Sequence, residues 1–209
     1  MCGIVAAVAD RNIVSVLLEG LRRLEYRGYD SAGLALINDA GLQRLRAVGR
    51  VAELAAQVDE TGAAGSTGIS HTRWATHGVP CERNAHPHIS GGLAVVHNGI
   101  IENHEVLRAR LRTEGYVFDS DTDTEVVAHL IALELRTQND LFTAVRAAIA
   151  QLQGAYAIAV LREDDPERIV VAREGSPLLL GIAEHGHYAA SDASALIQVT
   201  RRIVYLDNG

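Results

Sequence analysis

The chain opens with Met1-Cys2-Gly3-Ile4-Val5-Ala6-Ala7-Val8, and this apolar run predicts a buried β-strand that begins with the first residues of the chain. The apolar positions that follow recur at the three- and four-residue spacing of a helix: Val14, Leu17, Leu18, Leu21 and Leu24. Gly28 lies where such a helix can stop, because glycine adopts the backbone conformations that end helices. The first thirty residues therefore predict a buried strand followed by a helix that covers it.

The remaining residues predict a group of strands, then a group of helices, then strands again. The first group has strands at 32–38, 42–46, 68–72 and 93–97 and a short helix at 51–58. Helices follow at 103–114, 125–136 and 141–152, with Asp140 as the N-cap of the last. The final strands are expected at 155–161, 168–173, 178–183, 187–191 and 203–206. Helices and strands segregated in this way favour an α+β fold over alternating βαβ units.

Composition and charge exclude several classes of function. The chain has 209 residues, 48% of them hydrophobic, which suits one large domain or two small ones. A formal net charge of −7 disfavours binding to nucleic acid or to an anionic membrane surface. No apolar run approaches the ~20 residues needed to span a bilayer. Two cysteines far apart, Cys2 and Cys81, make a disulfide framework improbable and predict a reducing, cytoplasmic location.

Cys2 is the first candidate catalytic residue. A free cysteine is more often a small core residue, but removal of Met1 would leave a thiol and an α-amine on the same residue. An α-amine has an unperturbed pKa of ~7.7–8.0, so it can accept a proton at neutral pH and activate the nucleophile beside it. A retained Met1 would turn this amine into an amide without basicity.

The stretch His71-Thr72-Arg73-Trp74-Ala75-Thr76-His77-Gly78 opens a long irregular connection, predicted to run from 73 to 92, and such connections are often functional. The planar fork of Arg73 suits a carboxylate held by two parallel hydrogen bonds. Thr76 and His77 could add neutral donors, and Trp74 could cover the site as an apolar lid. The alternative is a surface loop with one exposed tryptophan.

Two further positions allow both a structural and a functional interpretation. Asn98-Gly99 is a strong hairpin signal, but the Asn98 amide and the Gly99 backbone N–H could also form an oxyanion hole. Asp123 could cap a helix or neutralise a substrate ammonium. The surrounding Asp-rich stretch is not a calcium loop, because Thr124 and Leu130 stand where that loop requires glycine and glutamate.

Several histidines suggest a metal site at first sight, but none forms an H-E-x-x-H pair and Cys81 has no second cysteine nearby. They are His71, His77, His86, His88, His97 and His104. Structural hydrogen bonding is the more common role of such residues, so neither a metal ion nor another cofactor is expected.

Taken together, these segments resemble the class II glutamine amidotransferase family, in the form found in bacterial glucosamine-6-phosphate synthases. The matching stretches are 1–5, 24–33 (Leu-Glu-Tyr-Arg-Gly-Tyr-Asp-Ser-Ala-Gly), 71–78, 84–88 (Asn-Ala-His-Pro-His), 96–104 (Val-His-Asn-Gly-Ile-Ile-Glu-Asn-His) and 121–125 (Asp-Thr-Asp-Thr-Glu). The resemblance implies a four-layer αββα sandwich of the N-terminal nucleophile hydrolase type, with mainly antiparallel sheets.

The resemblance also implies a role for each candidate residue. Cys2 would be the nucleophile, and Asn98 and Gly99 the oxyanion hole. The α-carboxylate of glutamine would bind Arg73 and its α-ammonium Asp123. The implied supporting residues are Trp74 on a closing loop, Thr76 and His77 in the pocket, Arg27 as an organiser near Cys2, and His86.

By the same resemblance, residues 1–209 are a glutaminase domain that hydrolyses L-glutamine to L-glutamate and ammonia through a Cys2 thioester. In a full-length member of the family, ammonia passes to sugar isomerase domains of the same polypeptide, which act on fructose-6-phosphate to make glucosamine-6-phosphate, and that protein is expected to be a homodimer. The isomerase region is absent from this chain. Two alternatives remain open: an N-terminal-cysteine amidohydrolase of other specificity, and a non-catalytic glutamine-binding module.

Overall fold

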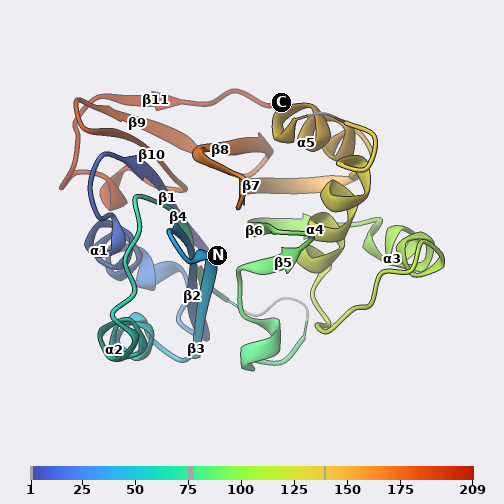
Figure 1. Ribbon diagram of the computed structural model, residues 1–209, viewed down its shortest axis with the longest axis horizontal. Helices are drawn as coiled ribbons and strands as arrows, with labels where there is room; N and C mark the ends of the chain where they lie inside the picture. Colours follow the sequence, from blue (N-terminus) through green and yellow to red (C-terminus); the bar gives the residue numbers. More distant parts are fainter. Residues whose placement is uncertain (1, 75–77, 139) are drawn as a thin grey trace.

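Two β-sheets pack face to face between two layers of helices in the computed structural model, which describes residues 2–74, 78–138 and 140–209. In Figure 1, α1 and α2 lie on the left, α3–α5 on the right, and the two sheets between them. This order of layers confirms the αββα sandwich expected from the sequence. No helix in the described part of the chain is long and apolar enough to cross a bilayer.

Both sheets are built from antiparallel neighbours. The larger sheet has the strand order β11-β9-β10-β1-β4-β2-β3 and the smaller one β5-β6-β7-β8. The strands of the larger sheet are β1 (Gly3–Ala9), β2 (Ser31–Asn38), β3 (Gly41–Val48), β4 (Thr67–Arg73), β9 (Leu179–Ala183), β10 (Gly186–Ala190) and β11 (Ile203–Tyr205). Those of the smaller sheet are β5 (His88–Ser90), β6 (Leu93–Ile101), β7 (Gly154–Arg162) and β8 (Asp165–Glu174).

The helices cover the outer faces of the two sheets. They are α1 (Val14–Leu24), α2 (Val51–Thr61), α3 (His104–Thr113), α4 (Asp123–Glu134) and α5 (Leu141–Ile149). Short 3-10 turns lie at Glu25–Arg27, Glu82–Asn84 and Ala193–Ala195. Helix α1 places Leu17, Leu21 and Leu24 against the larger sheet, and all three are fully buried.

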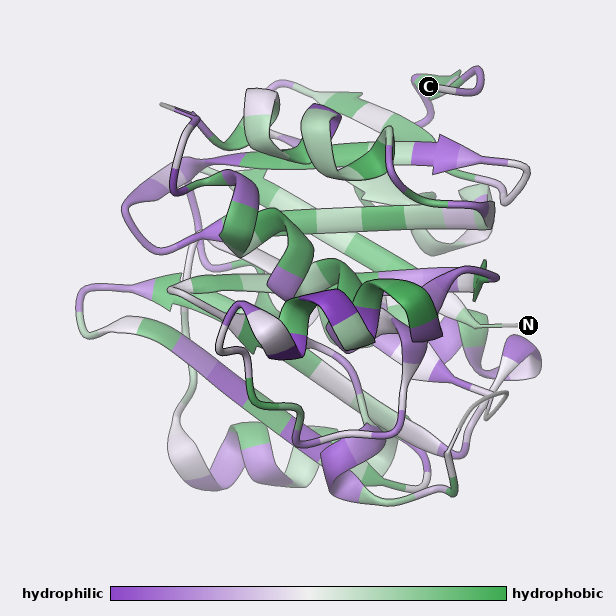
Figure 2. Ribbon diagram, turned by 90° about the vertical axis from the view of Figure 1, so that its right-hand side faces the viewer, coloured by the Kyte–Doolittle hydropathy of each residue, from purple (hydrophilic) through white to green (hydrophobic). Residues whose placement is uncertain are grey.

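The core between the sheets depends on the two-residue period of the strands. In β1, Ile4 and Ala6 belong to the inter-sheet core, whereas Val5 and Ala7 belong to the core under α1. Many inter-sheet residues are alanines, which allow the two sheets to approach closely. Figure 2 shows the strands mainly hydrophobic along their length and many of the connecting loops hydrophilic. A strand buried on both faces is what the continuous apolar run at the start of the sequence predicted.

Two expectations about the segments near the site were wrong. The strand predicted at 93–97 extends to Ile101, because β6 stays paired with β7 as far as Ile101 opposite Gly154. Asn98-Gly99 therefore lies inside a strand and is not a hairpin turn. The stretch 73–92 is also less irregular than predicted, since β5 pairs with the start of β6. Three residues are too few for an alternation pattern to be recognised.

Candidate active site

Cys2 lies at the end of the inter-sheet core, directly before β1. By the two-residue period, its side chain belongs on the same face of the strand as Ile4. Asn98 extends the inter-sheet positions of β6, which include Val96, in the same way. The two residues meet there, and the Asn98 Nδ2 donates a hydrogen bond to the Cys2 carbonyl oxygen at 3.1 Å. The face assignment of both strands therefore brings the predicted nucleophile and the predicted oxyanion donor together.

The backbone of Trp74 holds the Cys2 thiol. The Trp74 N–H donates to Sγ at 3.3 Å, and Sγ lies 3.6 Å from the Trp74 carbonyl oxygen. Burial raises the pKa of the Cys2 thiol, and this effect outweighs the opposing hydrogen bond from Trp74 and the nearby charge of Arg73. The thiol is therefore protonated at neutral pH and needs a base before it can act as a nucleophile.

Close backbone packing keeps Trp74 in this position. Strand β4 pairs with β1 through Thr72 opposite Gly3, which brings the residues after Thr72 next to Cys2. Gly28 lies against this turn, and a Cβ at that position would come within 2.9 Å of the Arg73 carbonyl carbon and of the Trp74 nitrogen. Only glycine allows the loop after α1 to approach the backbone around the thiol so closely.

A buried histidine fixes the orientation of the Asn98 amide. The His71 Nε2 lies 2.9 Å from the His97 carbonyl oxygen and 3.0 Å from the Asn98 Oδ1. Both partners are acceptors, so Nε2 carries the proton. Burial lowers the pKa of His71 to about 3, and the imidazole is neutral. Because Oδ1 is held by His71, Nδ2 faces Cys2. His71 was expected only to form structural hydrogen bonds, although it lies two residues before Arg73 on the same strand face.

His86, the predicted supporting residue, lines the same pocket as Cys2 but makes no hydrogen bond with the thiol among those of the described residues. Its ring stacks on that of His71 at 4.1 Å and lies 5.0 Å from the ring of His88. Burial holds the pKa of His86 well below its usual range and lowers that of His88 to about 3. These rings are neutral, and both are hydrogen-bonded, His86 to the His97 N–H and His88 to the Thr122 hydroxyl. No group of His, Cys, Asp and Glu in the described ranges could hold a metal ion.

Two buried side chains of opposite charge line a pocket with Cys2. Arg73 and Asp123 are each 4% exposed, and Arg73 donates from Nη2 to the Gly78 carbonyl oxygen at 3.1 Å. Asp123 is the first residue of α4, and its Oδ2 accepts a hydrogen bond from the Ile101 N–H at 2.9 Å. The pocket has a free volume of only about 10 Å³. A charge of each sign beside one thiol matches the two charges of a free amino acid.

Gly99 occupies a backbone conformation that other residues rarely adopt. Its φ is +127°, and a Cβ would lie 2.0 Å from the Ala155 carbonyl oxygen across the sheet. Both the strain and the clash require glycine at this position.

A wider cavity of about 250 Å³ adjoins the thiol on its outer side. It is lined by Cys2, Arg27, Trp74, Asn98, Gly99, Ile100, Ser176 and Pro177. Sequence reasoning missed Ile100 and the Ser176-Pro177 turn. The turn residues between two predicted strands were a signal for a loop, but nothing in the sequence indicated that this loop reaches Cys2.

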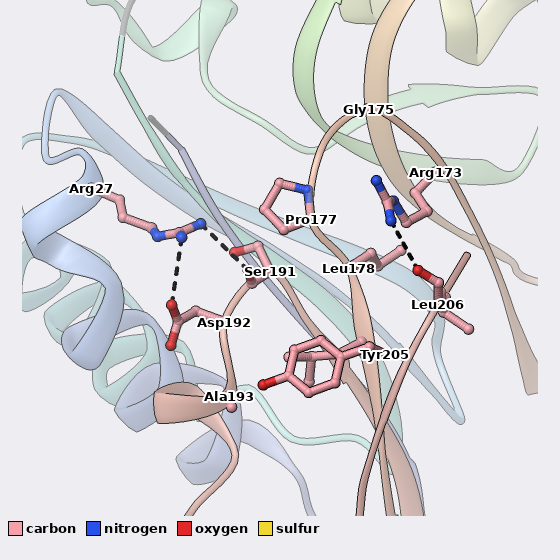
Figure 3. A pocket seen from close by; sticks show the side chains of 11 residues that line it. Arg27, Arg173, Gly175, Pro177, Leu178, Ser191, Asp192, Ala193, Tyr205 and Leu206 are labelled. Carbon is pink, nitrogen blue, oxygen red and sulfur yellow. Dashed lines mark hydrogen bonds and ion pairs between the residues drawn. The ribbon is translucent and has the colours of Figure 1, made fainter. Parts of the chain in front are cut away.

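Arg27 lies at the rim of the site and not at the thiol. Figure 3 shows it in a neighbouring cavity together with Ser191 and Asp192. This cavity encloses about 310 Å³, and in it the Arg27 Nη2 lies 3.5 Å from the Asp192 Oδ2 and Nη1 lies 3.4 Å from the Ser191 carbonyl oxygen. The Ser191 hydroxyl in turn accepts a hydrogen bond from the Ile4 N–H at 3.1 Å. Arg27 thus ties the turn after α1 to the segment that supports β1. Thr76 and His77 fall outside the described residues.

Comparison with known proteins gives one family and several relatives. A family model described as "Glutamine amidotransferase domain" matches residues 71–198. Proteins named glutamine--fructose-6-phosphate aminotransferase [isomerizing] from Vibrio vulnificus (strain YJ016) and Acidithiobacillus ferridurans are 58% and 60% identical over 210 and 211 residues. Each match covers 100% of this chain but 34% of the relative, so the chain spans about a third of their length.

Among solved structures, glutamine phosphoribosylpyrophosphate amidotransferase from B. subtilis superposes with a TM-score of 0.81 at 26% identity. The superposition covers 98% of this chain and 44% of that one.

Proposed function

The chain belongs to the family of glutamine amidotransferase domains, and from this premise we propose that it hydrolyses L-glutamine to L-glutamate and ammonia with Cys2 as its nucleophile. The observation that carries the proposal is the Cys2 thiol at a pocket that also holds buried Arg73 and Asp123. A thiol can attack an amide carbon, and the two charges can hold an amino acid in place.

We propose that the base is the α-amine of Cys2 itself, exposed when Met1 is removed. The raised pKa of the thiol supports this, because a protonated thiol must lose its proton before attack. The amine takes that proton while sulfur bonds to the side-chain amide carbon. It then passes the proton to the departing nitrogen, the C–N bond breaks, and ammonia leaves a glutamyl thioester. Water adds to the thioester carbon, the C–S bond breaks, and glutamate and the thiol are released.

The oxyanion of each tetrahedral intermediate is proposed to bind the Asn98 Nδ2 and the Gly99 backbone N–H. Asn98 uses one N–H on the Cys2 carbonyl oxygen, which leaves its second N–H for the substrate. His71 supports this assignment because it holds Oδ1 on the opposite side. Losing one such donor typically costs ~100- to 1000-fold in rate.

Glutamine is proposed to place its α-carboxylate on Arg73 and its α-ammonium on Asp123. The small free volume of this pocket means that side chains must move apart when glutamine enters. Trp74 is the described residue best suited to this movement, since it lines both the inner pocket and the outer cavity and is 47% exposed. Thr76 and His77 are proposed to complete the pocket, with Arg27 and His86 as supporting residues.

We further propose that residues 1–209 form the glutaminase domain of a longer polypeptide whose sugar isomerase domains use the ammonia to convert fructose-6-phosphate into glucosamine-6-phosphate. The names and greater length of the relatives support this. So do the large apolar side chains exposed in the two outer cavities, Ile100 at 44% and Tyr205 at 73%. The longer protein is proposed to be a homodimer in the cytoplasm, because the reducing conditions there keep Cys2 as a thiol.

The proposal is tested by intact mass measurement combined with a glutamine analogue that carries an electrophilic carbon in place of its amide. Loss of one methionine and a single adduct on Cys2 are expected. Cys81→Ala is the matched control, since it removes the other thiol and should be labelled like the parent chain. Labelling at Cys81 instead of Cys2 would refute the proposal.

Turnover assays distinguish the remaining alternatives. Glutamine should be hydrolysed faster than asparagine or a glutamine lacking its α-amine, because only glutamine fits both charges and the thiol. A preference for the substrate without the amine would favour a different amidohydrolase. Binding of glutamine without turnover, unchanged in Cys2→Ala, would favour a non-catalytic module.

A further inference from the structure

A second polar cavity lies at the open edge of the sandwich. It encloses about 290 Å³ between β3, the edge strand of the larger sheet, and β5, the edge strand of the smaller one. Within the described ranges, it shares no lining residue with the two pockets at Cys2. Its charged and polar lining consists of Arg44, Arg46, Arg83, His88, Asp119 and Glu125.

The face alternation of β3 explains why two arginines point into this gap. Leu42 packs on the inter-sheet core, whereas Leu45 and Ala47 pack on the core under the helices. Arg44 and Arg46 share the face of Leu42 by the two-residue period. The inter-sheet core therefore ends in two guanidinium groups where apolar side chains would otherwise continue it. Burial lowers the pKa of both arginines, and in Arg44 the neighbouring charge of Arg46 adds to this effect.

The hydrogen bonds of these arginines go to the backbone, although the negative charges of Asp119, Glu82 and Glu125 are near enough to oppose the lowering of both pKa values. Arg44 donates to the Pro87 carbonyl oxygen at 3.4 Å, and Arg46 donates to the carbonyl oxygens of Arg83 and Ala85 at 3.3 and 3.2 Å. These acceptors are neutral. Within the part of the chain that the structure describes, neither Arg44 nor Arg46 has a carboxylate within ion-pair distance.

The acidic residues of the cavity are placed differently. The Glu125 carboxylate is already engaged, since it accepts hydrogen bonds from the backbone of Asp119 and from the backbone and hydroxyl of Ser120 at 2.7–2.9 Å. The Asp119 side chain is exposed on the rim and forms no hydrogen bond or ion pair with another described residue. The cavity thus offers two guanidinium groups at one point and a carboxylate acceptor at another.

We propose that this cavity binds a small molecule through a phosphate group held by Arg44 and Arg46, with Asp119 accepting from a hydroxyl or amine of the same molecule. A phosphate monoester carries close to two negative charges and three acceptor oxygens, which suit two planar guanidinium forks better than a carboxylate does. Small-molecule sites usually measure ~300–1000 Å³, so a cavity at the lower limit fits a monosaccharide phosphate or free phosphate and not a dinucleotide.

The test is isothermal titration calorimetry of the 209-residue chain with fructose 6-phosphate and, separately, with inorganic phosphate, at constant ionic strength. Arg44→Gln is the first variant, because Arg44 lies on an edge strand, is only partly buried and makes a single long backbone hydrogen bond, so its loss should not unfold the chain. Arg22→Gln on α1 is the matched control, since it removes the same charge from a surface pair with Glu19.

Binding should be at least tenfold weaker in Arg44→Gln and lost when Arg46→Gln is added, and unchanged in Arg22→Gln. Asp119→Asn should weaken the binding of fructose 6-phosphate but not that of inorganic phosphate. If it weakens the binding of neither probe, the proposed contact of Asp119 with a hydroxyl or amine of the ligand is wrong. The proposal would be overturned if neither probe bound at a concentration 20-fold above a dissociation constant of ~1 mM, or if Arg44→Gln and Arg22→Gln bound equally well. The two arginines would then serve only as anchors for the backbone at 83–87.

Discussion

The neutral imidazole of His71 should determine how well Asn98 works during catalysis. His71→Leu keeps a side chain of similar bulk but removes the only polar atom that holds the Asn98 Oδ1 among the hydrogen bonds of the described residues. The amide would then be free to turn, and its Nδ2 would no longer be fixed toward Cys2. We expect kcat to fall while the KM for glutamine changes little, because His71 forms no hydrogen bond with Arg73 or Asp123.

The expected fall in kcat of His71→Leu can be estimated from the hydrogen bond that is lost. One neutral hydrogen bond contributes about 1 ± 0.5 kcal/mol, and each ~1.4 kcal/mol corresponds to tenfold in rate. The loss of orientation alone should therefore cost about 5-fold in kcat, and complete loss of the Asn98 donor about 100- to 1000-fold. The variant should fall between these limits. It should also unfold more easily, by about 1–3 kcal/mol, because two buried acceptors lose their donor.

Stopped assays of glutamate release give kcat and KM, and urea unfolding gives stability. His129→Leu is the matched control: His129 is also buried and contacts the Ser90 hydroxyl and the Val117 carbonyl oxygen, well away from the thiol in the hydrogen-bond network. It should lose stability without losing kcat, and His71→Gln, which keeps an N–H donor, should recover part of the rate. An unchanged kcat in His71→Leu, or an equal fall in His129→Leu, would refute the role given to His71.

Three further outcomes are expected. Gly99→Ala should lower stability by more than about 2 kcal/mol in urea unfolding, because the methyl group would clash with the Ala155 carbonyl oxygen in a backbone already at positive φ. Thr122→Ala should cost about 1 kcal/mol by removing the N-cap of α4, whereas Thr122→Ser should not. His71 and His88 have pKa values of about 3, below the ~6.5 of an unfolded histidine, so the unfolded chain binds more protons in acid. Stability should then fall as pH drops from ~6.5 toward 3, and an unfolding midpoint that does not move between pH 7 and 5 would contradict this.

Periodicity predicted the elements whose residues are all apolar on one face. Helix α1 begins and ends where the spacing from Val14 to Leu24 placed it, and the final strands of the sheets were also expected. The errors fall where function or pairing interrupts the pattern. The turn-like pair Asn98-Gly99 made the predicted strand end before the second half of β6. Strand β5 was too short to show an alternation.

Candidate residues of the right chemical type were recognisable in the sequence, but their neighbours were not. Arg73 and Asp123 are fifty positions apart, and no spacing rule indicates that they line one pocket. That proximity follows from the packing of the larger sheet, which contains β4, against the smaller sheet, which α4 covers. Ser176-Pro177 was missed for the same reason, since a turn gives no sign of which loop it faces.

The place of Cys2 follows from a simpler rule than the fold as a whole. Ile4 on β1 and Val96 on β6 belong to the same inter-sheet core, and the residue two positions along the same face of each strand lies at the edge of that core. The hydrogen bond from the Asn98 Nδ2 to the Cys2 carbonyl oxygen joins these two positions. Beside β1 that position is Cys2, and in β6 it is Asn98. A nucleophile directly before a central strand therefore lies beside the opposite sheet without a long loop to position it. Shifting β1 by one residue would place Gly3 there instead, so the register of β1 with β4 matters for catalysis as much as the thiol itself.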